Sequence, residues 1–239
     1  MRILEGKNVT KHFGGLAAVH QVDFNINQGE VVGLIGPNGA GKTTLFNLIS
    51  GSLPTTAGVI KYKGKKITGL KPHQICKKGI ARTFQSAKLF AGMSVFENAL
   101  AASLFGTKRA ISVPDAEKEA AELLEFVELS TVRVMLARDL AIAHRKRLEV
   151  ARALATKPDL LMFDEVMAGL NPAEVAQAME LITKIQKKGI TIFMIEHVMK
   201  AIMNVCDRII VLHHGSKIAE GMPGEIATSR TVIEVYLGE

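Results

Sequence analysis

Apolar and polar residues alternate through much of the first thirty positions, as they do in a β-strand with one buried face. Four residues carry the apolar side of this alternation: Val19, Val22, Phe24 and Ile26. Further along, residues 59–63 and 65–68 are short strand-like segments on either side of Gly64, which is the pattern of a hairpin. We therefore predict an antiparallel β lobe formed by about residues 1–30 and 58–70.

Four other segments are short and almost entirely apolar, which is typical of strands buried on both faces of a parallel sheet. They are residues 30–35, 160–163, 190–195 and 208–212. Asn171, Pro172 and Glu174 mark the start of a helix between two of them, with a cap, a proline in the first turn and a capping box. Strands that alternate with helices in this way predict a mainly parallel α/β sheet.

The middle of the chain has helical signals and no strand signal. Ser94 and Glu97 form a capping box at the start of a helix that should reach about Ser103. A second helix is predicted after Pro114, with apolar residues on one side and acidic residues on the other. We expect about residues 86–157 to form a helical subdomain. It belongs to a single domain over residues 1–239, whose remainder is the sheet core.

Positive charge is concentrated in one part of the chain. The formal net charge is +7, yet residues 31–96 contain ten Lys and Arg residues and no Asp or Glu. A local positive field of this kind suits an anionic ligand, an anionic membrane surface or nucleic acid, and composition leaves all three open. We expect the six lysines from Lys61 to Lys77 to lie mostly on a solvated face.

The sequence predicts neither a membrane-spanning helix nor a secretion signal. No apolar run approaches the roughly 18 residues that a spanning helix needs, and the first ten residues contain no apolar signal core. Cys76 and Cys206 have neither zinc-ligand spacing nor a disulfide framework. We expect reduced thiols that pack as small apolar groups.

Residues 36–44 match the P-loop pattern G-x-x-x-x-G-K-[ST] at every fixed position, after a predicted strand and before a predicted helix. Successive backbone N–H groups of such a loop can surround phosphate oxygens, and the helix start adds partial positive charge. Lys42 is expected to reach the β and γ phosphates, and the Thr43 hydroxyl to bind magnesium. The predicted nucleotide-binding residues of this segment are Gly36, Pro37, Asn38, Gly39, Ala40, Gly41, Lys42, Thr43 and Thr44.

Two carboxylates follow directly after the apolar strand 160–163. Asp164 and Glu165 should therefore lie at the carboxyl edge of the sheet, where ligands of open α/β folds bind. Asp164 is predicted to bind magnesium, and Glu165 to orient and deprotonate an attacking water. Beside a P-loop, this pair favours hydrolysis of a nucleotide.

Two other classes of P-loop protein fit the sequence less well. Residues 156–159 resemble the guanine-reading element [NT]-K-x-D of GTPases, but they precede a strand instead of following one, and no D-x-x-G follows the P-loop. Small-molecule kinases transfer phosphate to a substrate oxygen and do not need a residue such as Glu165 to activate water.

Over almost its whole length, the chain resembles the ATP-binding subunits of ABC transporters. Gln85 in Arg-Thr-Phe-Gln is similar to the Q-loop of that family, and His197 is similar to its switch histidine. Both occur in the family's order and spacing relative to the P-loop and the carboxylate pair. Phe13 lies where the family has the aromatic residue that stacks on adenine, with Val19 close by. The implied fold is α/β, a P-loop NTPase core with an antiparallel β lobe and an inserted helical subdomain.

Three softer motifs are most similar to the ABC subunits that energise branched-chain amino-acid uptake. They are residues 84–90, 168–172 and 235–238. The resemblance implies an ATPase with ATP and Mg²⁺ as cofactors. Gln85 would contact magnesium and the attacking water, and it would link the core to the helical subdomain. His197 would hydrogen-bond the γ phosphate, so the implied catalytic residues are Glu165, His197 and Gln85.

The same resemblance implies partners and a place in the cell. The chain would bind membrane permease subunits as a peripheral protein at the cytoplasmic face of the cell membrane. It would dimerise with itself or with a second ATP-binding cassette, and it would act indirectly with an external substrate-binding protein. Nucleic acid becomes the least expected partner. An alternative is a soluble ABC ATPase that does not take part in transport.

One segment departs from the family pattern. Residues 140–144 read Leu-Ala-Ile-Ala-His where the family has the signature Leu-Ser-Gly-Gly-Gln, which binds the γ phosphate held by the other subunit of a head-to-tail dimer. Ala141 has no hydroxyl, and Ala143 adds a methyl group where backbone and phosphate approach closely. One lost charge-assisted hydrogen bond costs about 1.5–3 kcal/mol. A second alternative is therefore a cassette with a weakened signature that acts beside an intact partner cassette.

Two smaller departures lie after the carboxylate pair. Val166 replaces the proline that usually follows it, and Asn171 stands where many relatives have aspartate.

Overall fold

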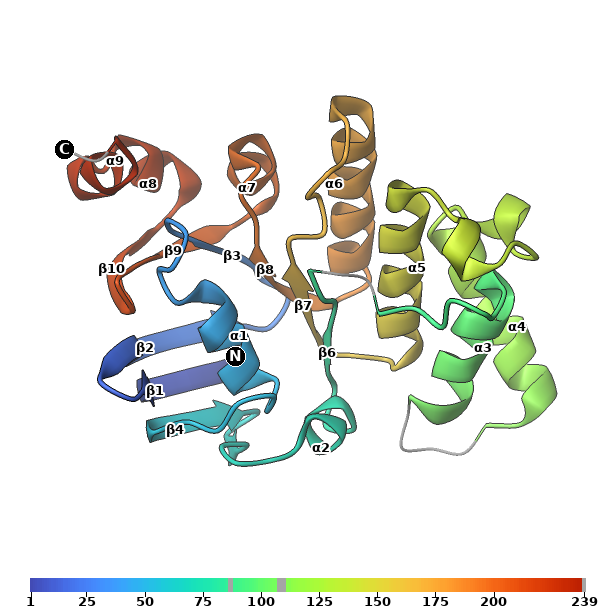
Figure 1. Cartoon of the computed structure of the whole chain (residues 1–239), viewed down its shortest axis with the longest axis horizontal. Coiled ribbons are helices and arrows are strands. Elements are labelled where there is room, and N and C mark those ends of the chain that lie inside the picture. Colours follow the sequence, from blue (N-terminus) through green and yellow to red (C-terminus); the bar gives the residue numbers. More distant parts are fainter. Residues whose placement is uncertain (86–87, 107–110, 238–239) are drawn as a thin grey trace.

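The computed structural model describes residues 1–85, 88–106 and 111–237. Two sheets form the left and centre of the molecule in Figure 1, and a group of helices covers the right. Ser86 and Ala87, which belong to the motif at 84–90, and Gly238 of the motif at 235–238 lie outside the described residues.

The smaller sheet is antiparallel, with strand order β2-β1-β4-β5. Its strands are β1 (Arg2–Phe13), β2 (Leu16–Asn27), β4 (Ala57–Tyr62) and β5 (Lys65–Lys66). Tyr62 pairs with Lys65 around Gly64, which confirms the predicted hairpin. The four apolar residues predicted to share one face of β2 are at most 3% exposed. The alternation therefore identified the buried face of this strand correctly.

The larger sheet has the order β10-β9-β3-β8-β7-β6. Its strands are β3 (Val31–Ile35), β6 (Ile80–Arg82), β7 (Leu160–Asp164), β8 (Thr191–Ile195), β9 (Arg208–His213) and β10 (Ser216–Gly221). All neighbours are parallel except β9 and β10, so the predicted mainly parallel sheet is confirmed. The four apolar segments became β3, β7, β8 and β9. The short β6 and the half-buried β10 had no such signal.

Among the described residues, six helices lie outside the helical group. They are α1 (Lys42–Ile49), α2 (Pro72–Cys76), α6 (Pro172–Lys187), α7 (Met199–Val205), α8 (Pro223–Thr228) and α9 (Arg230–Leu237). The predicted start of α6 is confirmed, since Asn171 caps the helix and forms a capping box with Glu174. None of the helices in the described ranges is long and apolar enough to cross a bilayer.

The helical group consists of α3 (Val95–Phe105), α4 (Val113–Phe126) and α5 (Ile142–Ala155), with single 3₁₀ turns at Ser130–Val132 and Ala137–Asp139. Ser94 caps α3 and forms the predicted capping box with Glu97. Between 88 and 156, the described residues contain no strand, only one isolated bridge between Ser94 and Leu136. The prediction of a helical stretch is therefore confirmed.

Two apolar clusters lie on the two faces of the larger sheet. Val31 and Ile35 of β3 belong to the cluster that includes residues of α3, α5 and α6. Val32 and Leu34, at the intervening positions, belong to the cluster that includes α1 and the smaller sheet. Because β3 and β7 are covered on both faces, their carboxyl ends are held at one edge, where the P-loop and the carboxylate pair emerge.

Candidate functional site

The P-loop connects the end of β3 to the start of α1. Lys42 is only 6% exposed, and its Nζ donates to the backbone oxygens of Gly36 at 2.6 Å and Pro37 at 2.9 Å. Burial lowers the pKa of the Lys42 ammonium, and the carboxylate of Glu165 opposes this shift. The loop therefore surrounds the Lys42 ammonium, which lies near the carboxylate of Glu165, the predicted general base.

Two glycines of the loop are required by its packing. A Cβ atom at Gly36 would lie 2.1 Å from the backbone oxygen of Leu212, and one at Gly41 would lie 2.3 Å from that of Ala18. Both residues also have positive φ, 149° and 101°. These contacts hold the loop between β9 and β2 so closely that only glycine, which has no Cβ atom, fits at either position.

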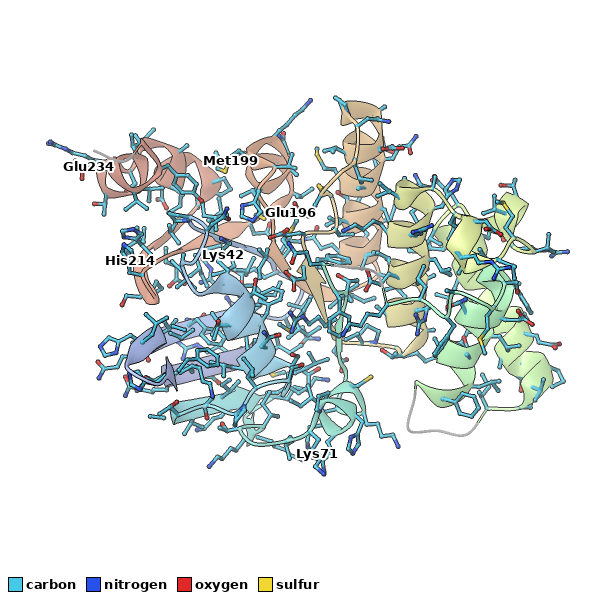
Figure 2. All side chains as sticks on the ribbon, in the orientation of Figure 1. Lys42, Lys71, Glu196, Met199, His214 and Glu234 are labelled. Carbon is cyan, nitrogen blue, oxygen red and sulfur yellow. The ribbon has the colours of Figure 1, made fainter. Side chains whose placement is uncertain are left out.

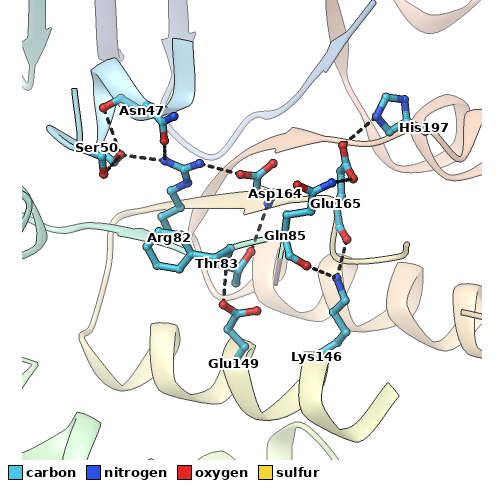
Figure 3. Close-up of polar contacts among 12 residues, drawn as sticks. Asn47, Ser50, Arg82, Thr83, Gln85, Lys146, Glu149, Asp164, Glu165 and His197 are labelled. Atoms are coloured by element: carbon cyan, nitrogen blue, oxygen red, sulfur yellow. Dashed lines mark hydrogen bonds and ion pairs between the residues drawn. The ribbon is translucent and has the colours of Figure 1, made fainter. Parts of the chain in front are cut away.

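Three side chains that the sequence assigned to catalysis meet at one point (Figure 3). Oε2 of Glu165 accepts a hydrogen bond from Nε2 of Gln85 at 2.9 Å, and Oε1 lies 2.8 Å from Nε2 of His197. Lys146 of α5 supports the same point from below, because its Nζ donates to the backbone oxygens of Glu165 at 2.8 Å and Gln85 at 3.3 Å. The described chain thus brings together residues 85, 165 and 197.

Glu165 has an unusual backbone. Its φ is 54°, which a non-glycine residue rarely adopts, and its N–H donates to the backbone oxygen of Ile195 at 2.9 Å. This conformation turns the carboxylate away from β7 toward His197. Residues held in such regions cluster at functional sites, where the surrounding structure enforces them.

Asp164 sits deeper than Glu165. It is 3% exposed, and its Oδ2 accepts a hydrogen bond from Nη2 of Arg82 at 2.7 Å. The Asp164 N–H donates to the Thr83 hydroxyl at 3.2 Å. Arg82 was not among the predicted site residues, because no sequence pattern predicts the three-residue strand β6 or the burial of its last side chain.

The residues predicted to bind magnesium fit that ion in chemistry. Among the described residues, no three His, Cys, Asp or Glu side chains converge as a complete metal site. Mg²⁺ needs only one or two carboxylates together with phosphate oxygens and water. Asp164 can supply the carboxylate, since only one of its oxygens is bonded to Arg82, and the exposed Thr43 can supply a hydroxyl.

The P-loop and the three predicted catalytic side chains line a cleft of about 330 Å³, and Asp164 lies behind its surface. The lining residues are Ala18, residues 38–44, Gln85, Glu165 and His197. Phe13 is 48% exposed at the end of β1, with Nζ of Lys11 5.1 Å from its ring centroid. Val19 is fully buried in the core, because the alternation of β2 turns it inward, and its neighbour Ala18 lines the cleft in its place.

The C-terminal helix also approaches the phosphate-binding loop. Burial raises the pKa of Tyr236, and a hydrogen bond with the backbone of Gly36 opposes this shift. Tyr236 was predicted only as part of the softer motif at 235–238.

The predicted signature segment forms the start of α5. Ala141 is the N-cap residue, with φ −62° and ψ 159°, and it makes no side-chain cap hydrogen bond. Ile142 is 57% exposed. Arg145 folds back, with Nε donating to the backbone oxygen of Leu140 at 2.8 Å. The start of this helix is therefore exposed, and no side-chain hydroxyl caps it.

Glu196 is a second site residue that the sequence did not single out. Its carboxylate is 2% exposed, and Oε1 accepts a hydrogen bond from the N–H of Met167 at 2.8 Å. Burial raises its pKa to about 7. Glu196, which directly precedes His197, thereby connects this part of the chain to the segment after Glu165; its side chain is labelled in Figure 2.

The Glu196→Gln variant should be less sensitive to pH than the wild-type chain. Between pH 4.5 and about 7, the folded chain keeps the proton of Glu196 and the unfolded chain releases it, so stability falls as pH rises through this window. Gln keeps an acceptor for Met167 but does not titrate, which should remove up to about 3 kcal/mol of this loss. Thermal unfolding at several pH values measures it, with the exposed Glu180→Gln as the control. An identical pH dependence in wild type and Glu196→Gln would contradict this.

A second, larger hollow lies between α2, β6, α3 and α5. It has a volume of about 520 Å³, and we call it the groove. Apolar residues that line it include Ile75, Ile80, Ala101, Phe90 and Phe105, and Arg82, Glu149 and Arg152 also reach it. Phe105 is 79% exposed and Phe90 is 48% exposed. The groove therefore extends from Arg82, which is bonded to Asp164, to the helical group.

The basic stretch divides into two parts. Lys42 is buried in the site, whereas the six lysines from Lys61 to Lys77 are all exposed, as predicted. Lys71, labelled in Figure 2, points outward near α2 and away from Lys42. Most of the positive charge is thus a solvated face and not a part of the cleft.

The fold and the cleft define a P-loop nucleotide hydrolase, and comparisons with known proteins specify it further. The sequence model described as "ABC transporter" matches residues 19–168. The chain is 41% identical to the high-affinity branched-chain amino acid transport ATP-binding protein BraF of Pseudomonas aeruginosa, with 99% of this chain and 98% of BraF covered. It is 40% identical to LivG of Escherichia coli K12, with the same coverage, and 35% identical to that organism's lipopolysaccharide export ATP-binding protein LptB, with 100% and 98% covered.

Solved structures agree. A nucleotide-free ATP-binding cassette from an ABC transporter matches with a TM-score of 0.90 and 32% identity, and both chains are covered in full. A dimeric bacterial ABC transporter cassette matches with a TM-score of 0.85 and 27% identity, covering 92% of this chain and 99% of the other. The chain therefore belongs to the ABC transporter family, as an ATP-hydrolysing cassette with the predicted α/β fold.

Proposed function

We propose that this ABC ATPase drives the import of branched-chain amino acids through membrane permease subunits, from the cytoplasmic face of the membrane. The observation that carries the proposal is the contact of Gln85, Glu165 and His197 beside the P-loop cleft. The substrate class rests on relatives of about 40% identity that are named for branched-chain amino-acid transport. An external binding protein would deliver the amino acid to the permeases.

In this proposal, the chain's own residues divide the work of hydrolysis. The P-loop amides and Lys42 hold the β and γ phosphates, and Phe13 stacks on adenine. Glu165 accepts a proton from the attacking water, and Gln85 and His197 orient its carboxylate through the two hydrogen bonds described. Thr43, Gln85 and Asp164 would hold Mg²⁺, which neutralises phosphate charge when it is bound.

The groove is the proposed seat of a permease segment. Its lining is mostly apolar, and its exposed aromatic rings, Phe90 and Phe105, are the kind of anchor that protein interfaces use. It also borders Arg82, three residues before Gln85, so that an occupant would lie close to the catalytic contact. A short apolar helix between two spans of a permease has the size and chemistry to fill it.

Replacing Phe105 with Asp should separate the chain from its permeases without changing its basal ATP hydrolysis. An exposed aromatic anchor in a groove contributes about 2 kcal/mol or more, so association should weaken at least about tenfold. The tagged chain is purified from membranes of its own cells in mild detergent, and uptake of labelled leucine, isoleucine and valine is measured in the same cells.

The matched control is Val134→Asp, which alters an apolar residue that is 78% exposed and does not line the groove. It should retain both permeases and uptake. A wild-type chain that brings no permease from the membrane would refute the transport proposal. If Phe105→Asp releases the permeases but leaves uptake of leucine, isoleucine and valine at the wild-type level, the substrate class alone is refuted.

A second candidate is an asymmetric pair, in which this chain acts beside a different cassette with an intact signature. The observation that favours it is the start of α5, where Ala141 supplies no hydroxyl to a partner's nucleotide. In such a pair, the partner's signature would complete the site on this chain, and this chain would complete the partner's site poorly.

A further inference from the structure

Arg82 lies at the centre of a buried polar network between the P-loop helix and the carboxylate pair (Figure 3). Its Nη1 donates to Oδ1 of Asn47 at 2.7 Å and to Oγ of Ser50 at 3.0 Å, both in or next to α1. Its Nη2 donates to Oδ2 of Asp164 at 2.7 Å. The side chains of Arg82 and Asp164 are 6% and 4% exposed. The ion pair is therefore almost completely removed from water.

The plane of this guanidinium is fixed on its other sides too. Its central carbon lies 5.6 Å from the ring centroid of Phe46 and 5.2 Å from that of Phe84. A planar fork held between two rings and three oxygen acceptors has one low-energy orientation. Arg82 consequently fixes which oxygen of Asp164 is bonded inward and leaves the other for a further partner.

Arg82 also lines the groove. Its Nε has no hydrogen-bond partner among the described residues and is closed to solvent. Two other groove-lining residues have such atoms, Glu149 at Oε2 and Arg152 at Nε. Buried polar atoms are nearly always paired in proteins, so an occupant that displaces part of this lining and offers polar groups would supply the missing partners.

We propose that Arg82 is a positioning residue that couples the groove to the magnesium ligand Asp164. The proposal rests on the magnesium role and on the groove occupant given under Proposed function. An acceptor that an occupant offers to Nε would pull on the same rigid fork that orients the Asp164 carboxylate. Arg82 does not line the cleft, and it acts through Asp164.

The first test measures nucleotide binding by the purified chain, without reference to turnover. Equilibrium titration with a fluorescent ATP analogue, in EDTA and in Mg²⁺, gives the gain in affinity that the metal provides. Arg82→Gln should lower this gain about tenfold, in the range observed when the residue that orients a metal ligand is lost, and should leave affinity in EDTA unchanged. Asn47→Ala, which keeps the ion pair and removes one anchor, should lower it less.

The controls separate this inference from those it builds on. Arg208→Gln removes a partly buried arginine that pairs with Glu30 and Glu220 far along the sheet, and should change stability only. Asp164→Asn should abolish the magnesium gain, and if it does not, the proposed metal site is wrong. If Asp164→Asn abolishes the gain while Arg82→Gln and Asn47→Ala keep it in full, Arg82 does not position the ligand.

The second test asks about the groove. In the assembled complex with permeases, the Mg²⁺ concentration that produces half of the gain in ATP affinity should differ from that of the free chain. Arg82→Lys keeps a charge beside Asp164 but cannot bridge both edges, so it should keep most of the magnesium gain and lose this difference. An equal shift in wild-type and Arg82→Lys complexes would overturn the coupling.

Discussion

The Glu165→Gln variant should bind ATP like the wild-type chain and hydrolyse it about 10² to 10⁴ times more slowly, which is the usual contribution of a general base. The amide has nearly the same shape as the carboxylate and can still hydrogen-bond Gln85 or His197, so the cleft should keep its form. It cannot accept a proton from water. Phosphate release measures turnover, and titration with a fluorescent ATP analogue measures binding.

Glu180→Gln is the matched control, because it makes the same change on an exposed position of α6. It should affect neither quantity. Turnover near the wild-type rate in Glu165→Gln would remove this residue as the base. Loss of ATP binding together with turnover would instead indicate that the hydrogen bonds of Glu165 to Gln85 and His197 hold the cleft together.

The double variant Ala141→Ser with Ala143→Gly should form an ATP-dependent dimer about 10 to 100 times more tightly than the wild-type chain. A serine hydroxyl at the N-cap of α5 adds one charge-assisted hydrogen bond to phosphate, worth about 1.5–3 kcal/mol. Glycine at 143 lets the helix start approach more closely. Light scattering with and without ATP, in the Glu165→Gln background that prevents turnover, measures the association.

Serine at this N-cap also stabilises α5 itself, by about 1 kcal/mol. That effect is independent of nucleotide and should raise the melting temperature of the single variant Ala141→Ser without ATP, which distinguishes it from the dimer contact; glycine at 143, inside α5, offsets it in the double variant. Ala121→Ser, on an exposed position of α4, serves as the control for added polarity. Unchanged association in the double variant, with ATP present, would show that this helix start does not meet a second nucleotide.

Local patterns were sufficient for the P-loop and for the strand that ends in Asp164 and Glu165. Both depend on consecutive residues, whose spacing determines where the backbone turns and what it offers. The capping boxes of α3 and α6 were predictable for the same reason. The elements that were hardest to predict from the sequence were β6, β10 and α2, which are short or half-buried and carry no periodic apolar face.

The meeting of Gln85 with Glu165 could not be derived from spacing. The two residues are 80 positions apart, and they meet because β6 pairs in parallel with β7 and places both strand ends at one edge. Family resemblance named Gln85 and His197 in advance, but only the sheet order explains their contact. Arg82 and Glu196 escaped notice because their importance lies in being charged and buried, and burial is a property of the whole fold.

Helix α5 contacts the site of its own chain through Lys146 and is exposed at its start. The ammonium of Lys146 holds the backbones of Gln85 and Glu165 of this chain's own site, while the start of the same helix, about one turn earlier, faces outward. In the proposed dimer, the rigid helix α5 would then contact the catalytic loops around one ATP molecule and the phosphates of the other ATP molecule. The occupancy of one nucleotide site would therefore affect the other site through α5, so the two hydrolysis events would not be independent in time.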